Sequence, residues 1–175
     1  SDYTYFMALV TPPGNKAERN IMSRETIILL DHSGSMGGSK SEAGFWTVRQ
    51  YLDRMNPRDL FSFGLFHDSA VWHYPGLVPA TRENIDSVND FLNMSHQMGG
   101  TQLIPALKQA MSMPKAEEDR SRHVLIITDA QIDNSDGNQC IKMALEEMEK
   151  SDRRRVSVIC IDSSPNSQLV NELTE

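Results

Sequence analysis

The chain alternates between short apolar runs and longer stretches in which apolar residues recur every three or four positions. Three of the runs are rich in β-branched residues and apolar at successive positions: residues 26–30, 123–127 and 156–161. Runs of this kind are typical of parallel strands that helices cover on both sides. We therefore predict that these three strands form the centre of a sheet.

Four of the stretches outside these runs show the spacing of an amphipathic helix. Residues three and four positions apart lie on one face of a helix, so each set forms a stripe that packs against the sheet. The four stripes are Phe45, Val48, Leu52 and Met55; Ile85, Val88 and Leu92; Ile104, Leu107 and Met111; and Ile141, Leu145 and Met148. We interpret them as core rather than as binding surfaces.

Residues 60–75 differ, because two strand-like runs are joined by only three residues, 67–69. Such a short link forms a hairpin, which places an antiparallel strand at one edge. Pro75 and Pro79 are expected to break the pattern before the next helix. Residues 5–10 are a further strand candidate. The sequence thus predicts an α/β fold: a doubly wound, mostly parallel sheet with one antiparallel edge strand and helices on both faces.

The length of 175 residues fits a single domain over 1–175. Because the chain begins with Ser, we expect it to be a piece excised from a longer protein, with residues 1–20 forming an N-terminal strand and linker. No apolar run reaches the roughly 20 residues that a membrane-spanning helix needs, so no membrane insertion is expected in this segment.

The net charge of -7 argues against a nucleic-acid partner, which would require clustered Lys and Arg on one face. The one basic run, residues 153–155, is interpreted as a solvated loop. Cys140 and Cys160 lack the spacing and the neighbouring His of a zinc site, and each is expected to be a small buried hydrophobe.

The candidate chemistry begins where the first predicted central strand ends. Leu30 is followed by Asp31, and Ser33 and Ser35 come next at alternate positions. Ligands of open α/β sheets bind beyond the carboxyl ends of the strands, where the strand order reverses. Asp129 follows the strand predicted at 123–127. If the strand order reverses between this strand and the one at 26–30, the two strands lie side by side and both carboxylates come together. Two carboxylates at such a short distance repel each other unless a cation lies between them.

Residues 99–101, of sequence GGT, precede a predicted helix and add the hydroxyl of Thr101 to this edge. Magnesium prefers hard oxygen ligands and takes one or two carboxylates from a protein. The candidate metal ligands are therefore Asp31, Ser33, Ser35, Thr101 and Asp129.

The combination of D-x-S-x-S, a G-G-T loop and T-D at a strand end resembles the metal-ion-dependent adhesion site of von Willebrand factor type A domains. The TPP before the first central strand, GGTQLIPAL and SSPNSQLV resemble the type found in inter-alpha-trypsin inhibitor heavy chains and their prokaryotic relatives. This resemblance implies a Rossmann-like fold and Mg²⁺ as the ion, with Mn²⁺ or Ca²⁺ as alternatives. It also implies that Asp31 and Asp129 act through bound water, whereas the three hydroxyl residues touch the ion.

The resemblance further implies a binding module, not an enzyme, whose protein partner presents an Asp or Glu to the metal. It favours an extracellular or cell-envelope location. Two departures stand out: Ala130 replaces the glycine that usually follows the T-D pair, and the chain stops before a last strand that the family carries. We expect the first departure to alter the backbone of the loop.

The main alternative is a nucleotide-binding loop in a phosphoryl-transfer enzyme. Residues 34–41, GSMGGSKS, miss the pattern G-x-x-x-x-G-K-[ST] only at Ser39, and Lys40 and Ser41 would contact phosphate and Mg²⁺. Against this reading, Asp31 would lie at the mouth of the loop and repel phosphate.

Three further readings fail on the residues themselves. A phosphoryl-aspartate enzyme would lack its general acid, because Ser33 stands where a second Asp is needed. A serine nucleophile would have only the adjacent His32 as its base, and the other histidines are interpreted as ordinary polar residues. Residues 133–138 match only part of a calcium loop, so a helix cap is the better interpretation.

Overall fold

The fold is built on a five-stranded sheet. The structure is a computed structural model that describes residues 22–96, 99–116, 119–129 and 134–161. The strand order is β3-β2-β1-β4-β5. The strands are β1 (Arg24–Asp31), β2 (Leu60–Phe66), β3 (Ala70–Pro79), β4 (Ser121–Thr128) and β5 (Arg155–Cys160). Only the β2–β3 pair is antiparallel among the pairs of this sheet. The predicted α/β class and the antiparallel edge strand are confirmed.

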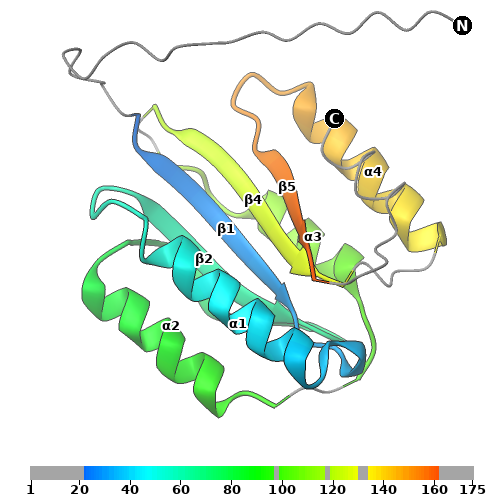
Figure 1. The fold of residues 1–175 in the computed structure, drawn as a ribbon. Helices are drawn as coiled ribbons and strands as arrows, with labels where there is room; N and C mark the ends of the chain where they lie inside the picture. Colours follow the sequence, from blue (N-terminus) through cyan, green and yellow to red (C-terminus); the bar gives the residue numbers. More distant parts are fainter. Residues whose placement is uncertain (1–21, 97–98, 117–118, 130–133, 162–175) are drawn as a thin grey trace, which may run out of the picture.

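Helices cover both faces of the sheet (Figure 1). α1 (Ser39–Leu52) and α2 (Arg82–Met94) lie on one face, and α3 (Leu103–Ser112) and α4 (Asn134–Met148) lie on the other. β1 is buried along nearly its whole length because its side chains alternate between these faces. Ile28 and Leu30 join the core under α1 and α2, whereas Ile27 and Leu29 join the core under α3 and α4.

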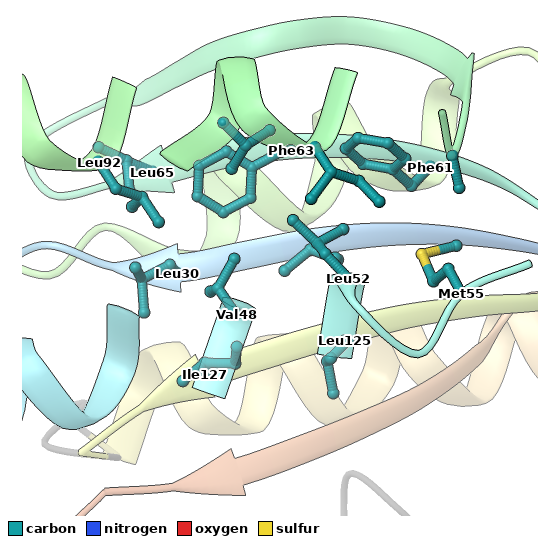
Figure 2. Close-up of a cluster of buried hydrophobic side chains, with 14 of the residues drawn as sticks. Leu30, Val48, Leu52, Met55, Phe61, Phe63, Leu65, Leu92, Leu125 and Ile127 are labelled. Atoms are coloured by element: carbon teal, nitrogen blue, oxygen red, sulfur yellow. The ribbon is translucent and has the colours of Figure 1, made fainter. Parts of the chain in front are cut away.

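The helical stripes of α1 and α2 meet in one core, and that of α3 lies in the other. In Figure 2, Val48 and Leu52 of α1 point toward the sheet, and Leu92 of α2 lies beside Leu65 of β2. The stripes of α1, α2 and α3 are buried or packed against the two cores, as predicted. Met55 also joins this core, although it lies beyond the end of α1.

The predicted stripe on α4 is wrong at two of its three positions, although Ile141 packs against the core as predicted. Leu145 and Met148 are 54% and 43% exposed. The side of α4 that faces the sheet carries the small residues Cys140 and Ala144, followed by Glu147, which is buried. Glu147 accepts a hydrogen bond from the Arg154 backbone N–H and forms an ion pair with Lys115. A charged residue with partners is therefore buried where the apolar spacing had predicted Leu145 and Met148.

Two predictions about the sheet are also corrected. β5 is half-buried and lies at the edge of the described sheet, whereas β2 is in its interior, next to β1. Pro75 does not end a strand, because β3 continues through it to Pro79. A proline is tolerated there because β3 is an edge strand of the described sheet and its pairing with β2 is irregular around Phe63.

The basic run at 153–155 is only partly a solvated surface. Arg153 and Arg155 are exposed as predicted, but Arg154 is 0% exposed. Its guanidinium donates to the carboxylate of Glu25 and to carbonyl oxygens at the end of α3. Arg154 is therefore part of the interior.

Within the described ranges, no helix is long and apolar enough to cross a membrane. Cys140 is buried as predicted, whereas Cys160 is only half-buried. The strand predicted at 5–10 and the departure at Ala130 lie outside the described residues.

Candidate metal site at the carboxyl ends of β1 and β4

The strand order places the ends of β1 and β4 side by side, as the position of the two aspartates predicted. The arrowheads of both strands point to the edge of the sheet where α1 begins (Figure 1). The Thr128 hydroxyl of β4 donates a hydrogen bond of 2.5 Å to Asp31 Oδ2. Asp31 is 1% exposed and Asp129 is 0% exposed, so this edge holds two buried carboxylates.

The loop after β1 folds back on its own aspartate. The Ser33 N–H donates to Asp31 Oδ1 over 3.0 Å, and the Ser33 and Ser35 hydroxyl oxygens lie 3.0 Å apart. A short 3-10 helix (Gly34–Met36) follows, which leaves Ser33 buried and Ser35 exposed. Three of the predicted oxygen ligands therefore lie together, with one hydroxyl facing solvent.

The GGT loop joins this site through its backbone. The Gly34 N–H donates to the Gly99 carbonyl over 3.1 Å. On the other side, the Gly100 N–H donates to Asp68 Oδ1 over 2.6 Å, and the Gln102 N–H donates to the His67 carbonyl over 2.7 Å. These bonds fix both flanks of Thr101, which is half-buried.

Gly99 is needed for this arrangement. Its φ of 70° lies in the region that glycine adopts at no steric cost. A Cβ atom at this position would also overlap the carboxylate of Asp68. The loop can approach the β2–β3 turn closely only because the residue has no side chain.

The electrostatics of the site oppose two free carboxylates. Burial raises the pKa of the Asp31 carboxyl, hydrogen bonds from Ser33 and Thr128 lower it, and the charge of Asp129 raises it further. Lys40 Nζ lies 2.9 Å from Asp129 Oδ2 and balances one of the charges. A site of this kind favours a cation.

The donor set fits a hard divalent cation. Among the described residues, no three His, Cys, Asp or Glu side chains are arranged to hold a metal. The hydroxyls of Ser33 and Ser35 lie together beside Asp31, and the backbone bond between Gly34 and Gly99 brings the loop that carries Thr101 to the same edge. Oxygen donors with few carboxylates are the chemistry that Mg²⁺ accepts.

The first half of residues 34–41 is bonded within the chain rather than open to a phosphate. A phosphate loop needs several N–H groups pointing at its ligand. Here the N–H groups of Gly34, Met36 and Gly37 donate to the carbonyls of Gly99, Ser33 and Gly34. The Lys40 ammonium, which that reading assigned to phosphate, is bonded to Asp129.

The structure brings together histidines that the sequence had placed on separate elements. His32 is buried and stacks on Phe45, with 5.9 Å between the ring centroids. Burial lowers the pKa of His32, and the charge of the nearby His67 lowers it further. His96 also lies close enough to influence it. Sequence spacing missed this proximity because the three residues come from different loops.

Two further sequence hypotheses were about residues near this edge. α4 begins at Asn134, so residues 134–138 lie at its start, whereas Asp133 is outside the described residues and the cap itself stays a prediction. The Ser33 hydroxyl contacts Ser35 rather than His32. The charged groups at the ends of β1 and β4 are the buried Asp31 carboxylate and the Lys40–Asp129 ion pair.

Comparison with known proteins identifies the family. The α/β sheet and the loops at its carboxyl edge define a Rossmann-like domain. The von Willebrand factor type A domain model matches residues 24–175, and the chain belongs to this family. Members of the family are generally metal-dependent protein-interaction modules.

The individual relatives agree with this assignment. The chain is similar to inter-alpha-trypsin inhibitor heavy chain H4 of Homo sapiens, with 29% identity over 118 residues, which are 67% of this chain and 12% of that protein. It is also similar in fold to the von Willebrand factor type A structure from Catenulispora acidiphila, with 17% identity, a TM-score of 0.73 and coverage of 87% of this chain and 36% of that one.

The conserved hypothetical protein BatB from Bacteroides thetaiotaomicron shares the fold with a TM-score of 0.68 at 18% identity, over 87% of this chain and 85% of that one. The chain thus spans a small part of the heavy chains that it resembles and most of BatB. The resemblance read from the D-x-S-x-S, G-G-T and T-D motifs is confirmed at the level of the family.

Proposed function

We propose that Asp31, Ser33, Ser35, Thr101 and Asp129 hold a magnesium ion through which the chain binds an acidic side chain of a protein partner. The observation that carries the proposal is the convergence of three loops on two buried carboxylates, fastened by the Thr128–Asp31 and Gly34–Gly99 hydrogen bonds. Mn²⁺ and Ca²⁺ are alternatives that accept the same oxygen donors.

Asp31 and Ser35 would have different roles at the site. Asp31 is already oriented by hydrogen bonds from Ser33 and Thr128, so its position does not depend on a ligand. Ser35 is exposed and marks the side from which a partner would approach. When bound, the ion would offer an open coordination position to an anionic oxygen of the partner.

The same features support a binding module rather than an enzyme. The N–H groups of Gly34, Met36 and Gly37 are bonded within the chain, and the hydroxyls of Ser33 and Ser35 contact each other rather than a base. The membership of the family agrees with this assignment. An extracellular or cell-envelope setting remains a prediction of the resemblance.

Isothermal titration with MgCl₂ and MnCl₂ tests the site directly. The wild-type chain should bind one ion, and Asp31→Ala should abolish the binding because it removes the most strongly oriented carboxylate. Ser69→Ala, at an exposed position of the β2–β3 turn, is a matched control that should bind as the wild type does.

Anomalous diffraction from a crystal soaked with Mn²⁺ locates the bound ion. Anomalous density beside Asp31, Ser33 and Thr101 is expected. Density at another place, or equal Mn²⁺ affinity in wild type and Asp31→Ala, would refute the assignment of the site.

A further inference from the structure

Lys40 occupies a position at the candidate site that the metal proposal does not use. Its Nζ lies 2.9 Å from Asp129 Oδ2, and its side chain is 27% exposed while that of Asp129 is 0% exposed. The ammonium therefore approaches the buried carboxylate from the solvent side. The pair joins α1 to the end of β4 across 89 residues of sequence.

The placement of Lys40 is unfavourable for the helix taken alone. Lys40 is the second residue of α1 (Ser39–Leu52), and a cation in the first turn opposes the helix dipole. The glutamate at position 42 in the same turn is the favourable kind of charge. A lysine at this position is thus better explained by its partner than by helix stability.

The partner needs a positive charge as well. A fully buried carboxylate is costly unless a cation or several donors compensate it. Asp129 also lies close enough to Asp31 for its charge to oppose the ionisation of Asp31. A divalent cation held by the five proposed ligands would supply the same compensation as Lys40, and the two positive charges would repel each other.

We propose that Lys40 is a built-in counter-ion of Asp129 that competes with the divalent cation and thereby sets how tightly the metal is held. The inference rests on the proposed metal site and adds its regulation. In the metal-free chain the ammonium keeps Asp129 compensated and the loops assembled. When the metal binds, the contact between Lys40 and Asp129 loosens and the ammonium moves toward solvent.

Titration of Mn²⁺ into Lys40→Met tests the competition. Methionine keeps most of the length of the side chain but lacks its charge, so the variant should bind Mn²⁺ roughly tenfold more tightly than the wild type, as expected from removing one nearby charge at the effective dielectric of a protein surface. Lys40→Arg keeps the charge and should stay near the wild type. Lys142→Met removes an exposed lysine of α4 and is the matched control, with no change expected.

The outcomes separate this inference from the function on which it rests. If the wild type binds Mn²⁺ and Lys40→Met binds it equally or more weakly, Lys40 is not a competitor and the inference is overturned. If neither chain binds Mn²⁺, the proposed metal site itself fails, and this inference fails with it.

Lysine acetylation provides a second measurement that needs no variant. With sulfo-NHS-acetate and mass spectrometry on the wild-type chain, Lys40 should react slowly in EDTA, because its ammonium is bonded to Asp129, and several-fold faster in saturating Mg²⁺. Lys142 should react equally in both. Equal rates for Lys40 in the two conditions would overturn the inference, even if Lys40→Met does not fold.

Discussion

Arg154 Nη2 lies 3.2 Å from Glu25 Oε1, and both side chains are 0% exposed. Glu25 is near the start of β1, so this pair is at the opposite end of the strand from Asp31. The guanidinium also donates to the carbonyl of Ala110 in the last turn of α3 and to that of Met113 just after the helix. One side chain thus connects β1, α3 and the start of β5.

The first prediction concerns this buried pair. Arg154→Met should lower the free energy of unfolding by about 3–5 kcal/mol, because it leaves Glu25 buried without its main partner and removes the donors to α3. Urea denaturation followed by circular dichroism measures the change. Arg153→Met is the matched control, since Arg153 is exposed, and it should change stability by less than about 0.5 kcal/mol. Equal losses in the two variants would show that the buried pair contributes little.

The basic run at 153–155 shows a limit of sequence reasoning. Three consecutive arginines before a strand have the composition of a solvated loop, and two of them are exposed. Arg154 can be buried because Glu25 and the carbonyls of Ala110 and Met113, all distant in sequence, surround its guanidinium in the folded chain. Neither residue carries a local pattern that reveals its partner, so a pairing of this kind becomes visible only with the tertiary structure.

The second prediction is that Mg²⁺ stabilises the fold. At a free metal concentration about 100-fold above the dissociation constant, binding to the native chain alone adds roughly 2.7 kcal/mol to the free energy of unfolding. Thermal melts in EDTA and in MgCl₂ should therefore differ by several degrees. Asp31→Asn should melt at the same temperature in both, because it removes a proposed ligand.

Ionic strength must be matched in that experiment, since screening alone changes the interactions of exposed charges. NaCl at the same ionic strength as the MgCl₂ sample is the control. A wild-type melting curve that is the same in EDTA and in saturating MgCl₂ would show that metal binding and folding are not coupled.

The third prediction concerns Gly64 in β2. A Cβ atom here would lie 2.6 Å from Trp72 Cε3 on the neighbouring strand. The Trp72 ring cannot move away freely, because its Nε1 donates to Gln109 Oε1 over 2.6 Å. Gly64→Ala should therefore cost about 1–3 kcal/mol through overpacking.

Gly76→Ala in β3 is the matched control for this substitution. A Cβ atom at Gly76 would have no heavy atom within 4 Å, so the variant should be at least as stable as the wild type. Urea denaturation of both variants decides the matter. If Gly64→Ala is as stable as Gly76→Ala, the contact with Trp72 does not limit the strand.

The proximity of Asp31 and Asp129 was predictable for a simple reason, whereas their role as metal ligands stays a prediction. Asp31 and Asp129 each end a buried strand, and the topology of α/β sheets brings such ends together. The contacts around these two carboxylates were not predictable in this way. Lys40 was read as part of a phosphate-binding pattern, whereas its partner is Asp129. Asp68 was read only as a turn residue, although its carboxylate accepts the N–H of Gly100.

The last prediction tests this role of Asp68. The carboxylate lies on the exposed β2–β3 turn, yet its hydrogen bond of 2.6 Å to the Gly100 N–H fixes the backbone directly before Thr101. Asp68→Ala removes this acceptor and should weaken Mn²⁺ binding roughly threefold to tenfold, in line with the loss of one charge-assisted hydrogen bond of about 1 kcal/mol.

Asn retains an oxygen acceptor at the same position but has no charge, so Asp68→Asn separates positioning from electrostatic attraction. If Asp68 acts by holding the loop, Asp68→Asn should bind Mn²⁺ nearly as tightly as the wild type, while Asp68→Ala does not. If the negative charge itself attracts the cation, both variants should lose affinity equally, and raising the salt concentration should diminish the effect. Isothermal titration of the two variants at low and high NaCl, with Ser69→Ala as the control on the same turn, distinguishes these outcomes.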